Sequence, residues 1–246
     1  MGYEGRRVFR PVSVLYLLLL LFAFILLLPM IFLFLGRLLA SALGLPPWWV
    51  GVFLLLSLVG SFVNVPVGTL KSRVPILTVK EVSAFGVTWQ VPGVGVGVEK
   101  THVLVNVGGA VLPVLVSAYL LGLPLMLPGG FHEYVAVGAV LLAVTVIVNR
   151  SAQVIEGFGV ATPALVPPLA TLMATVLVNY LSPLQAPVQV AYIGGTLGTL
   201  IGADLLNLHR VRDIGAPIVS VGGAGTFDGI YLTGIVSVLL VFLVLG

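Results

Sequence analysis

The sequence contains no cysteine among its 246 residues, and it has only three histidines. Disulfides and thiolate metal sites are therefore excluded. His102, His132 and His209 lie too far apart in the chain to form a metal-ligand motif. We accordingly expect neither a metal nor another cofactor. The lack of cysteine, together with abundant Val, Gly and Pro, is also typical of a thermophile protein.

Charge is scarce as well, at 8% of the residues, whereas a soluble domain carries about 25%. No dense cluster of Lys and Arg with interleaved aromatic residues occurs, so the sequence gives no sign of nucleic-acid binding. Gly-x-Ser-x-Gly, His-Glu-x-x-His and Walker A motifs are all missing. Serine hydrolase, zinc protease and nucleotidase functions therefore lack support.

Apolar residues dominate instead, at 59% of the chain, and the mean hydropathy is +1.22. Repeated apolar runs lie close to the ~18-residue threshold for crossing a bilayer. The composition predicts an all-α polytopic membrane protein, with residues 1–246 as one integral membrane domain in contact with the lipid bilayer. About seven membrane spans are predicted, over residues 12–35, 47–65, 103–123, 133–149, 160–180, 188–208 and 228–245.

The cations suggest an orientation in the cell membrane. With a cytoplasmic N-terminus and an external C-terminus, ten of the eleven Lys and Arg residues fall on the cytoplasmic side, and only Arg37 falls outside. This distribution follows the positive-inside rule.

Residues 74–102 differ from the rest of the chain, because apolar residues alternate there with small or polar ones. This period of two predicts a small cytoplasmic β-hairpin between spans two and three, with strands 85–91 and 94–100 around a turn at Pro92-Gly93. The hairpin could be a structural cap, or its exposed edge could pair with an extended peptide.

Glycine and proline indicate where helices pack closely or break. Gly194, Gly198 and Gly202 follow the small-xxx-small pattern of close helix packing. Asp204 is displaced by about 200° from Gly202 around a helix, so it should face another neighbour or a cavity. The prolines of residues 163–168 and the Asn106-Val-Gly-Gly stretch predict breaks in two further spans.

Two aspartates stand out in this apolar setting, Asp204 near the end of the sixth predicted span and Asp228 at the start of the seventh. A carboxylate at membrane depth costs several kcal/mol unless it is paired or hydrated, and it marks a functional site by default. Two adjacent carboxylates share a proton and can activate water for peptide hydrolysis. Alternatively, Asp228 caps the last helix and Asp204 pairs with His209, Arg210 or Arg212. The supporting residues would be Asn207, on the face of Asp204, and the glycines Gly222, Gly223 and Gly225, which leave room for backbone.

The stretches YIGGTLGTLIGADLLNL and GGAGTFDGIYLTG resemble a family of archaeal and bacterial multispanning membrane proteins with a domain of unknown function. Asp204, Asp228 and the glycines before Asp228 are also similar to the presenilin and signal-peptide-peptidase class of intramembrane aspartic proteases. That similarity implies that Asp204 and Asp228 are catalytic. The sequence departs from that class because Thr226 and Phe227 intervene before Asp228, and because Pro163-Ala164-Leu165 precedes both acids.

Three functions therefore remain open at this stage. The first is an intramembrane aspartic protease that cleaves a transmembrane peptide. The second is a proton- or cation-coupled transporter that uses the same acids. It is suggested by the Gly-Gly pair that residues 105–112 and 192–200 have in common. The third is a non-catalytic membrane subunit.

The orientation leads to a first testable prediction. Reporter fusions within residues 66–102 and 209–226 should report a cytoplasmic location, because most cations lie in or next to these segments. A fusion at residues 36–46 is the control and should report the opposite side. An external signal from either of the first two segments would contradict the orientation.

Overall fold

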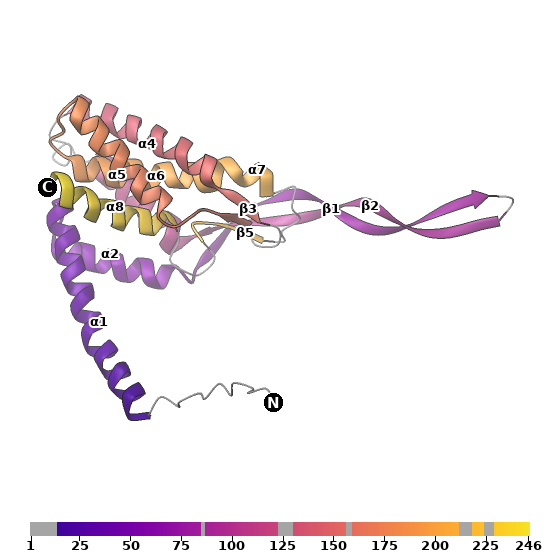
Figure 1. Ribbon diagram of the computed structural model, residues 1–246, viewed down its shortest axis with the longest axis horizontal. Coiled ribbons are helices and arrows are strands. Elements are labelled where there is room, and N and C mark those ends of the chain that lie inside the picture. The colour runs from indigo at the N-terminus through magenta and orange to yellow at the C-terminus, as the bar shows by residue number, and fades with distance from the viewer. Residues whose placement is uncertain (1–13, 85–86, 123–129, 156–158, 212–217, 224–228) are drawn as a thin grey trace, which may run out of the picture.

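The computed structural model describes residues 14–84, 87–122, 130–155, 159–211, 218–223 and 229–246. Its elements, in chain order (Figure 1), are α1 (Val14–Leu43), α2 (Pro47–Gly60), β1 (Asn64–Ala84), β2 (Val87–Asn106), η1 (Val107–Val111), α3 (Leu112–Gly122), α4 (Phe131–Ser151), β3 (Gln153–Ile155), β4 (Gly159–Ala161), α5 (Val166–Leu181), α6 (Pro187–Thr199), η2 (Leu200–Asp204), η3 (Leu205–Asn207), α7 (Leu208–Val211), β5 (Ile218–Val221) and α8 (Gly229–Leu245).

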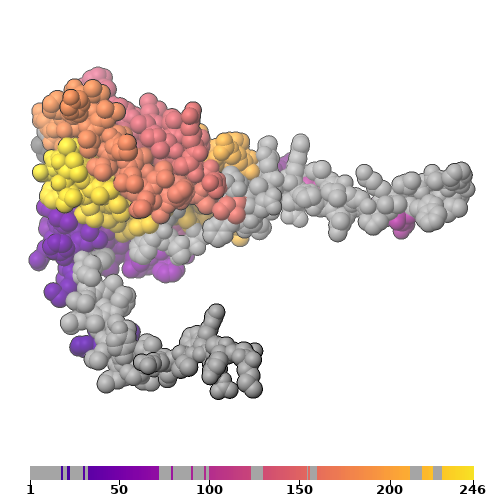
Figure 2. All heavy atoms as spheres, viewed as in Figure 1, coloured from indigo at the N-terminus to yellow at the C-terminus, as the bar shows by residue number. Residues whose placement is uncertain are grey.

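Most of the helices form one packed body, from which the N-terminal part of α1 extends away and β1 and β2 leave as a long twisted ribbon (Figure 1). Twenty residues at about 3.3 Å each give the ribbon a length of about 65 Å. In the space-filling view, α4, α5 and α8 form one continuous face of the helical body (Figure 2). The short elements α7 and β5 lie at the end of this body from which the ribbon departs (Figure 1).

Helix α6 is the centre of the helical body. Every residue from Val190 to Thr196 is buried, and α6 packs against α4, α5, α8 and α3. A helix buried on all sides must present small or apolar side chains all round. Helix α6 does so with alanine, glycine, valine and isoleucine, together with a few hydroxyl-bearing residues.

Glycines bring α6 and η2 into close contact with α4. A Cβ atom added to Gly194 would lie 2.7 Å from Val140, and one added to Gly198 would lie 2.9 Å from the carbonyl oxygen of Leu141. A Cβ on Gly202 would meet the Thr145 carbonyl oxygen at 2.6 Å. The small-xxx-small pattern thus marks the interface between α6 and α4, which only glycine permits at this separation.

Strands β1 and β2 pair antiparallel from Asn64 opposite Asn106 to Ala84 opposite Val87, and β5 pairs parallel with β2. This hairpin differs from the expected one. Pro92 and Gly93 do not form its turn; they lie inside β2, opposite Val79 and Thr78. Proline is tolerated there because β2 has a second neighbour only at residues 102–105, so its other edge needs no N–H donor.

The prediction of an all-α membrane protein with about seven spans is wrong, because the described residues include a three-stranded sheet and few of the helices are long enough to span a bilayer. Among the described residues, α4 is the one helix long and apolar enough to cross a bilayer alone. Residues 33–43 of α1 and helix α2 meet that criterion only together, and they are bent by 119° relative to each other. The turn between them contains Gly44, with a φ of 69°, and Pro46.

Hydropathy overcounted the spans because it does not distinguish a continuous helix from an interrupted one. The predicted span 103–123 begins as strand and π-helix and leaves α3 with 11 residues. The predicted span 160–180 begins as strand β4, and α5 starts only at Val166. The last predicted span is α8, whose 17 residues are fewer than the ~20 usually needed.

The close packing of α6 on α4 yields a second prediction. Replacing Gly198 by alanine should lower the stability of the protein by about 1–3 kcal/mol, because the new methyl group meets backbone and the helices must separate. The measurement is the thermal unfolding midpoint of the purified protein in detergent. Gly138→Ala is the matched control, since a Cβ there meets nothing within 4 Å. Equal midpoints for the two variants would refute this account of the interface.

Candidate functional site

The α-helical geometry of α6 ends at Thr199 and continues as the π-helix η2 and the 3-10 turn η3. This change leaves backbone carbonyl groups available for side chains. The Gly202 carbonyl oxygen accepts hydrogen bonds from Asn149 Nδ2 at 3.1 Å and from Asn207 Nδ2 at 2.9 Å. Short π-helical segments inside helices often occur at functional sites.

Asp204 is the last residue of η2 and lines a small pocket with a mixed polar and apolar surface. We call it the Asp204 pocket. Its cavity volume is about 60 Å³, which suffices for a few water molecules or a small ion. The lining residues are Val160, Thr162, Ala164, Pro167, Thr199, Ala203, Asp204, Gly229 and Ile230.

Thr199 supplies a second polar group to this pocket. Its side chain is 1% exposed, and its hydroxyl has no hydrogen-bond partner within the described part of the chain. Thr196, one helical turn earlier, also has a buried hydroxyl with no hydrogen-bond partner among the described residues. Buried hydroxyl groups normally have a protein, water or ion partner, so Thr199 is suited to binding a ligand that enters the pocket.

The Asp204 carboxylate also joins the helical body to the end of β5. Its Oδ2 accepts a hydrogen bond of 2.8 Å from the backbone N–H of Gly222. Gly222 and Gly223 have φ values of 82° and 87°, a region in which side chains other than glycine are strained. A Cβ on Gly222 would also lie 2.6 Å from the Cβ of Ala110. Glycine therefore lets this turn pass between Asp204 and η1.

A network of asparagine and serine side chains supports the turn from the opposite side. Asn106 Oδ1 accepts from the Gly109 N–H at 2.8 Å, and Asn106 Nδ2 donates to the Ser61 carbonyl and to Asn64 Oδ1. The Ser220 hydroxyl lies 2.7 Å from Asn64 Oδ1 and 2.6 Å from the Gly223 carbonyl oxygen. The network thus joins the end of α2, the ribbon, η1 and β5.

Only some of the residues predicted for the site lie at or next to the Asp204 pocket. Asp204 lines the pocket, and Gly222 is bonded to it. Asn207 is buried but does not line the pocket; its amide bonds to the carbonyls of Gly202 and Ala203 and so stabilises the helix break. Asp228 and Gly225 lie outside the described residues, so the expected Asp204–Asp228 pair rests on the sequence.

Sequence reasoning did not single out Thr199 or Ala164 as pocket residues. Thr199 lies five positions before Asp204, a spacing that would not place both on one face of a regular α-helix; the π-helix changes that relation. Ala164 belongs to the Pro163-Ala164-Leu165 stretch. This stretch precedes both aspartates in the chain, which is a departure from the protease class. The position of Ala164 in the pocket follows from tertiary packing.

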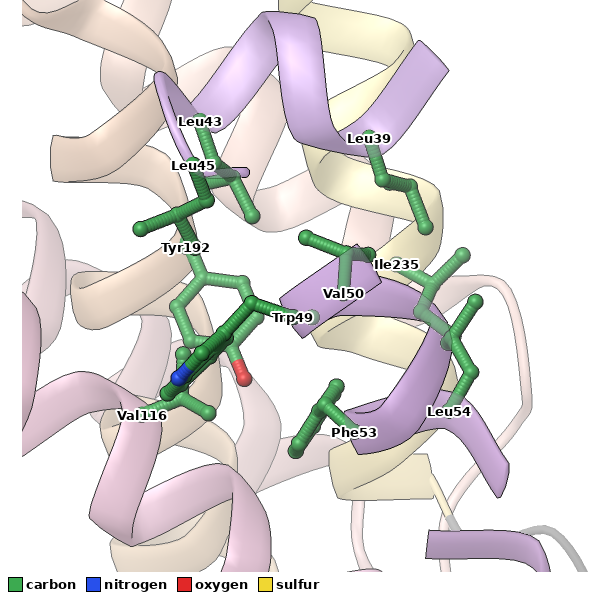
Figure 3. A pocket seen from close by; sticks show the side chains of 11 residues that line it. Leu39, Leu43, Leu45, Trp49, Val50, Phe53, Leu54, Val116, Tyr192 and Ile235 are labelled. Carbon is green, nitrogen blue, oxygen red and sulfur yellow. The ribbon is translucent and has the colours of Figure 1, made fainter. Parts of the chain in front are cut away.

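A second cavity, between α1, α2, α3, α6 and α8, is apolar and measures about 20 Å³. Figure 3 shows Tyr192 there, beside Trp49 and Phe53 of α2 and Val116 of α3. This cavity has no carboxylate in its lining and serves as part of the core. Within the described ranges, no three histidine, aspartate or glutamate side chains gather into a metal-binding cluster.

The family model described as "Protein of unknown function (DUF1614)" matches residues 58–240. The match covers most of the chain, so the protein belongs to the DUF1614 family. It includes the ribbon, the Asp204 pocket and most of α8. Neither the curated proteins nor the solved structures gave a match. The family agrees with the expected domain of unknown function.

The asparagine network gives a third prediction. Asn106→Ala should destabilise the protein by about 1–3 kcal/mol or more, because Asn106 is 1% exposed and its removal leaves buried backbone groups without partners. Thermal unfolding in detergent is again the measurement. Ser151→Ala, which removes one hydroxyl bond within a single helix, is the control and should change little. A tolerated Asn106→Ala would show that the network is not needed for folding.

Proposed function

We propose that this member of the DUF1614 family is a membrane-embedded aspartic endopeptidase whose catalytic pair is Asp204 and Asp228. One observation carries the proposal. The Asp204 pocket is also lined by Ala164, from the Pro-Ala-Leu stretch, and by Gly229, the residue that follows Asp228 in the chain. The pocket therefore brings together Asp204, one residue of the Pro163-Ala164-Leu165 stretch and the chain neighbour of Asp228, although Ala164 and Asp204 are 40 positions apart in the sequence.

The chemistry would use one carboxylate as base and the other as acid. The base removes a proton from a water molecule that attacks the scissile carbonyl, and the acid protonates the leaving amine. A pocket of about 60 Å³ matches this role, since it accommodates water but excludes the bulk of a peptide. The Gly222 N–H fixes the orientation of the Asp204 carboxylate. Orientation of this kind is what a general base requires.

An extended substrate could reach the site along β5. In the sheet order β1-β2-β5, strand β5 stands at one end, so its second edge is unpaired within the described residues. Ile218 at its start is 56% exposed. A peptide added to this edge would form main-chain hydrogen bonds next to the Gly222 turn that holds Asp204.

The surface of the helical body supports a location in a bilayer. Large apolar side chains are exposed on α1, α2, α4, α5 and α8, for example Phe34 at 70%, Val59 at 65% and Met173 at 71%. Apolar surface of this extent marks contact with a membrane or a partner. The low charge of the chain and the length of α4 favour the membrane.

The orientation proposed from the sequence is compatible with this arrangement. Lys71, Lys100 and His102 on the ribbon and Arg210 on α7 are exposed at one end of the molecule. Arg37 lies in the part of α1 toward the other end (Figure 1). The ribbon end would then face the cytoplasm, where positively charged segments accumulate.

A proton- or cation-coupled transporter is the second candidate, and the Thr199 hydroxyl favours it. The Asp204 carboxylate and the buried Thr199 hydroxyl, which has no partner among the described residues, are oxygen ligands suited to a small cation. Broken helices with free carbonyls, such as η2, are typical of cation sites in transporters. The protease needs Asp228 and does not need Thr199, which separates the two functions experimentally.

The fourth prediction tests catalysis. The purified protein in proteoliposomes should cleave transmembrane peptides, and Asp204→Asn or Asp228→Asn should reduce the rate by roughly 100-fold or more, because an amide cannot complete the acid–base cycle. Thr199→Val should retain most of the cleavage. Products are measured by mass spectrometry, and Asp213→Asn is the matched control, which should leave the rate unchanged.

The same vesicles distinguish the transporter. If the wild type cleaves no peptide but shows proton or sodium flux that both Asp204→Asn and Thr199→Val abolish, the endopeptidase proposal is wrong and the second candidate holds. Cleavage that survives Asp204→Asn would also reject the protease. Thermal unfolding midpoints close to that of the wild type show that each variant is folded.

A further inference from the structure

The base of the ribbon carries two lysines directly opposite each other. The register places Lys71 of β1 against Lys100 of β2, and Thr69 against His102 in the neighbouring pair on the same face. All four side chains are exposed. Like charges at directly opposed positions of an antiparallel pair destabilise it. An anion bound between the two lysines would therefore offset their repulsion.

No described side chain supplies that anion. Neither lysine forms an ion pair within the described part of the chain. Glu99 occupies the adjacent ladder position, opposite Ser72. The other face at this height is packed against the helical body, where Thr101 and Val103 are buried and Leu70 is half-buried. The lysine face consequently points outward.

The position of the pair along the ribbon indicates what the anion belongs to. Between the helical body and Lys71, the ribbon exposes Val65 at 45% and Val67 at 60%, and the adjacent strand β5 exposes Ile218 at 56%. At the base of the ribbon, exposed apolar residues therefore lie between the helical body and the cationic pair, with Ile218 directly beside His102. The same order is found in a bilayer, from hydrocarbon to charged headgroups.

We propose that Lys71, Lys100 and His102 form a binding site for the phosphate of an anionic phospholipid headgroup. Two ammonium groups on neighbouring strands can hold one phosphate between them, and Ile218, which pairs with His102, contacts the acyl region of the same lipid. The site would fix the ribbon relative to the membrane surface. This inference does not depend on the proteolytic activity, because it uses none of the residues of the Asp204 pocket.

The test uses the full chain in a neutral detergent and two soluble probes, dihexanoyl phosphatidylglycerol and dihexanoyl phosphatidylcholine. Binding is followed by thermophoresis at low and at moderate salt. The wild type should bind the anionic lipid more tightly than the zwitterionic one, with an affinity that falls as salt increases. The double variant Lys71→Gln/Lys100→Gln should bind the anionic lipid roughly tenfold or more weakly, since each lysine near an anionic surface contributes substantially.

Arg37→Gln is the matched control, because it removes an exposed cation from α1 and should leave the affinity unchanged. Equal binding of both lipids, or undiminished binding by the double variant, would overturn the proposal. If inorganic phosphate displaces the lipid at equal concentration, the site recognises a free anion and the lipid assignment is wrong. An unchanged unfolding midpoint confirms that the double variant is folded.

Discussion

The close approach of backbones at glycine is the constraint on which the rest of the structure depends. Gly194, Gly198 and Gly202 let α6 and η2 lie against α4 at a distance that no side chain would permit. With the helices so near, Thr145 and Asn149 of α4 can reach the carbonyls of Gly198 and Gly202. These bonds compensate carbonyl groups that a regular helix would have satisfied internally, so the π-helix η2 can form there. Glycine packing thus determines where α6 deviates and, as a result, where Asp204 stands.

Close backbone contact at glycine residues also occurs on the other side of Asp204. Gly108 and Gly109 of η1 bring that segment against Ser57 of α2 and against the carbonyl of Gly222, and Gly222 in turn gives its N–H to Asp204. Two π-helical segments, η1 and η2, therefore flank one glycine turn. Each is held by asparagine: Asn106 caps η1, and Asn207 bonds to carbonyls of η2. The carboxylate is oriented by backbone groups, which cannot rotate away as a side chain could.

The sequence predicted the features that arise from residues close together in the chain, and it failed for those that depend on long-range pairing or tertiary packing. Glycine spacing located the interface on α6, and the Asn106-Val-Gly-Gly stretch marked the break at η1, because both effects arise within a few residues. The span count failed since apolar residues satisfy a hydropathy criterion in strand, π-helix and short helix alike. Pro92-Gly93 resembled a turn, yet long-range pairing of β1 with β2 placed it within a strand. Ala164 and Thr199 joined the pocket through tertiary contacts that no local pattern contains.

The position of the pocket limits the chemistry it can support. Asp204 lies where the helical body meets the sheet, since it ends η2 and accepts a hydrogen bond from the turn that follows β5. The cavity beside Tyr192 is lined by apolar side chains. A transported ion would have to continue beyond the pocket along α6, where every residue from Val190 to Thr196 is buried. A hydrolytic reaction needs no such continuation, because water is consumed at the site itself. The endopeptidase proposal therefore requires no path beyond the pocket, whereas the transporter proposal does.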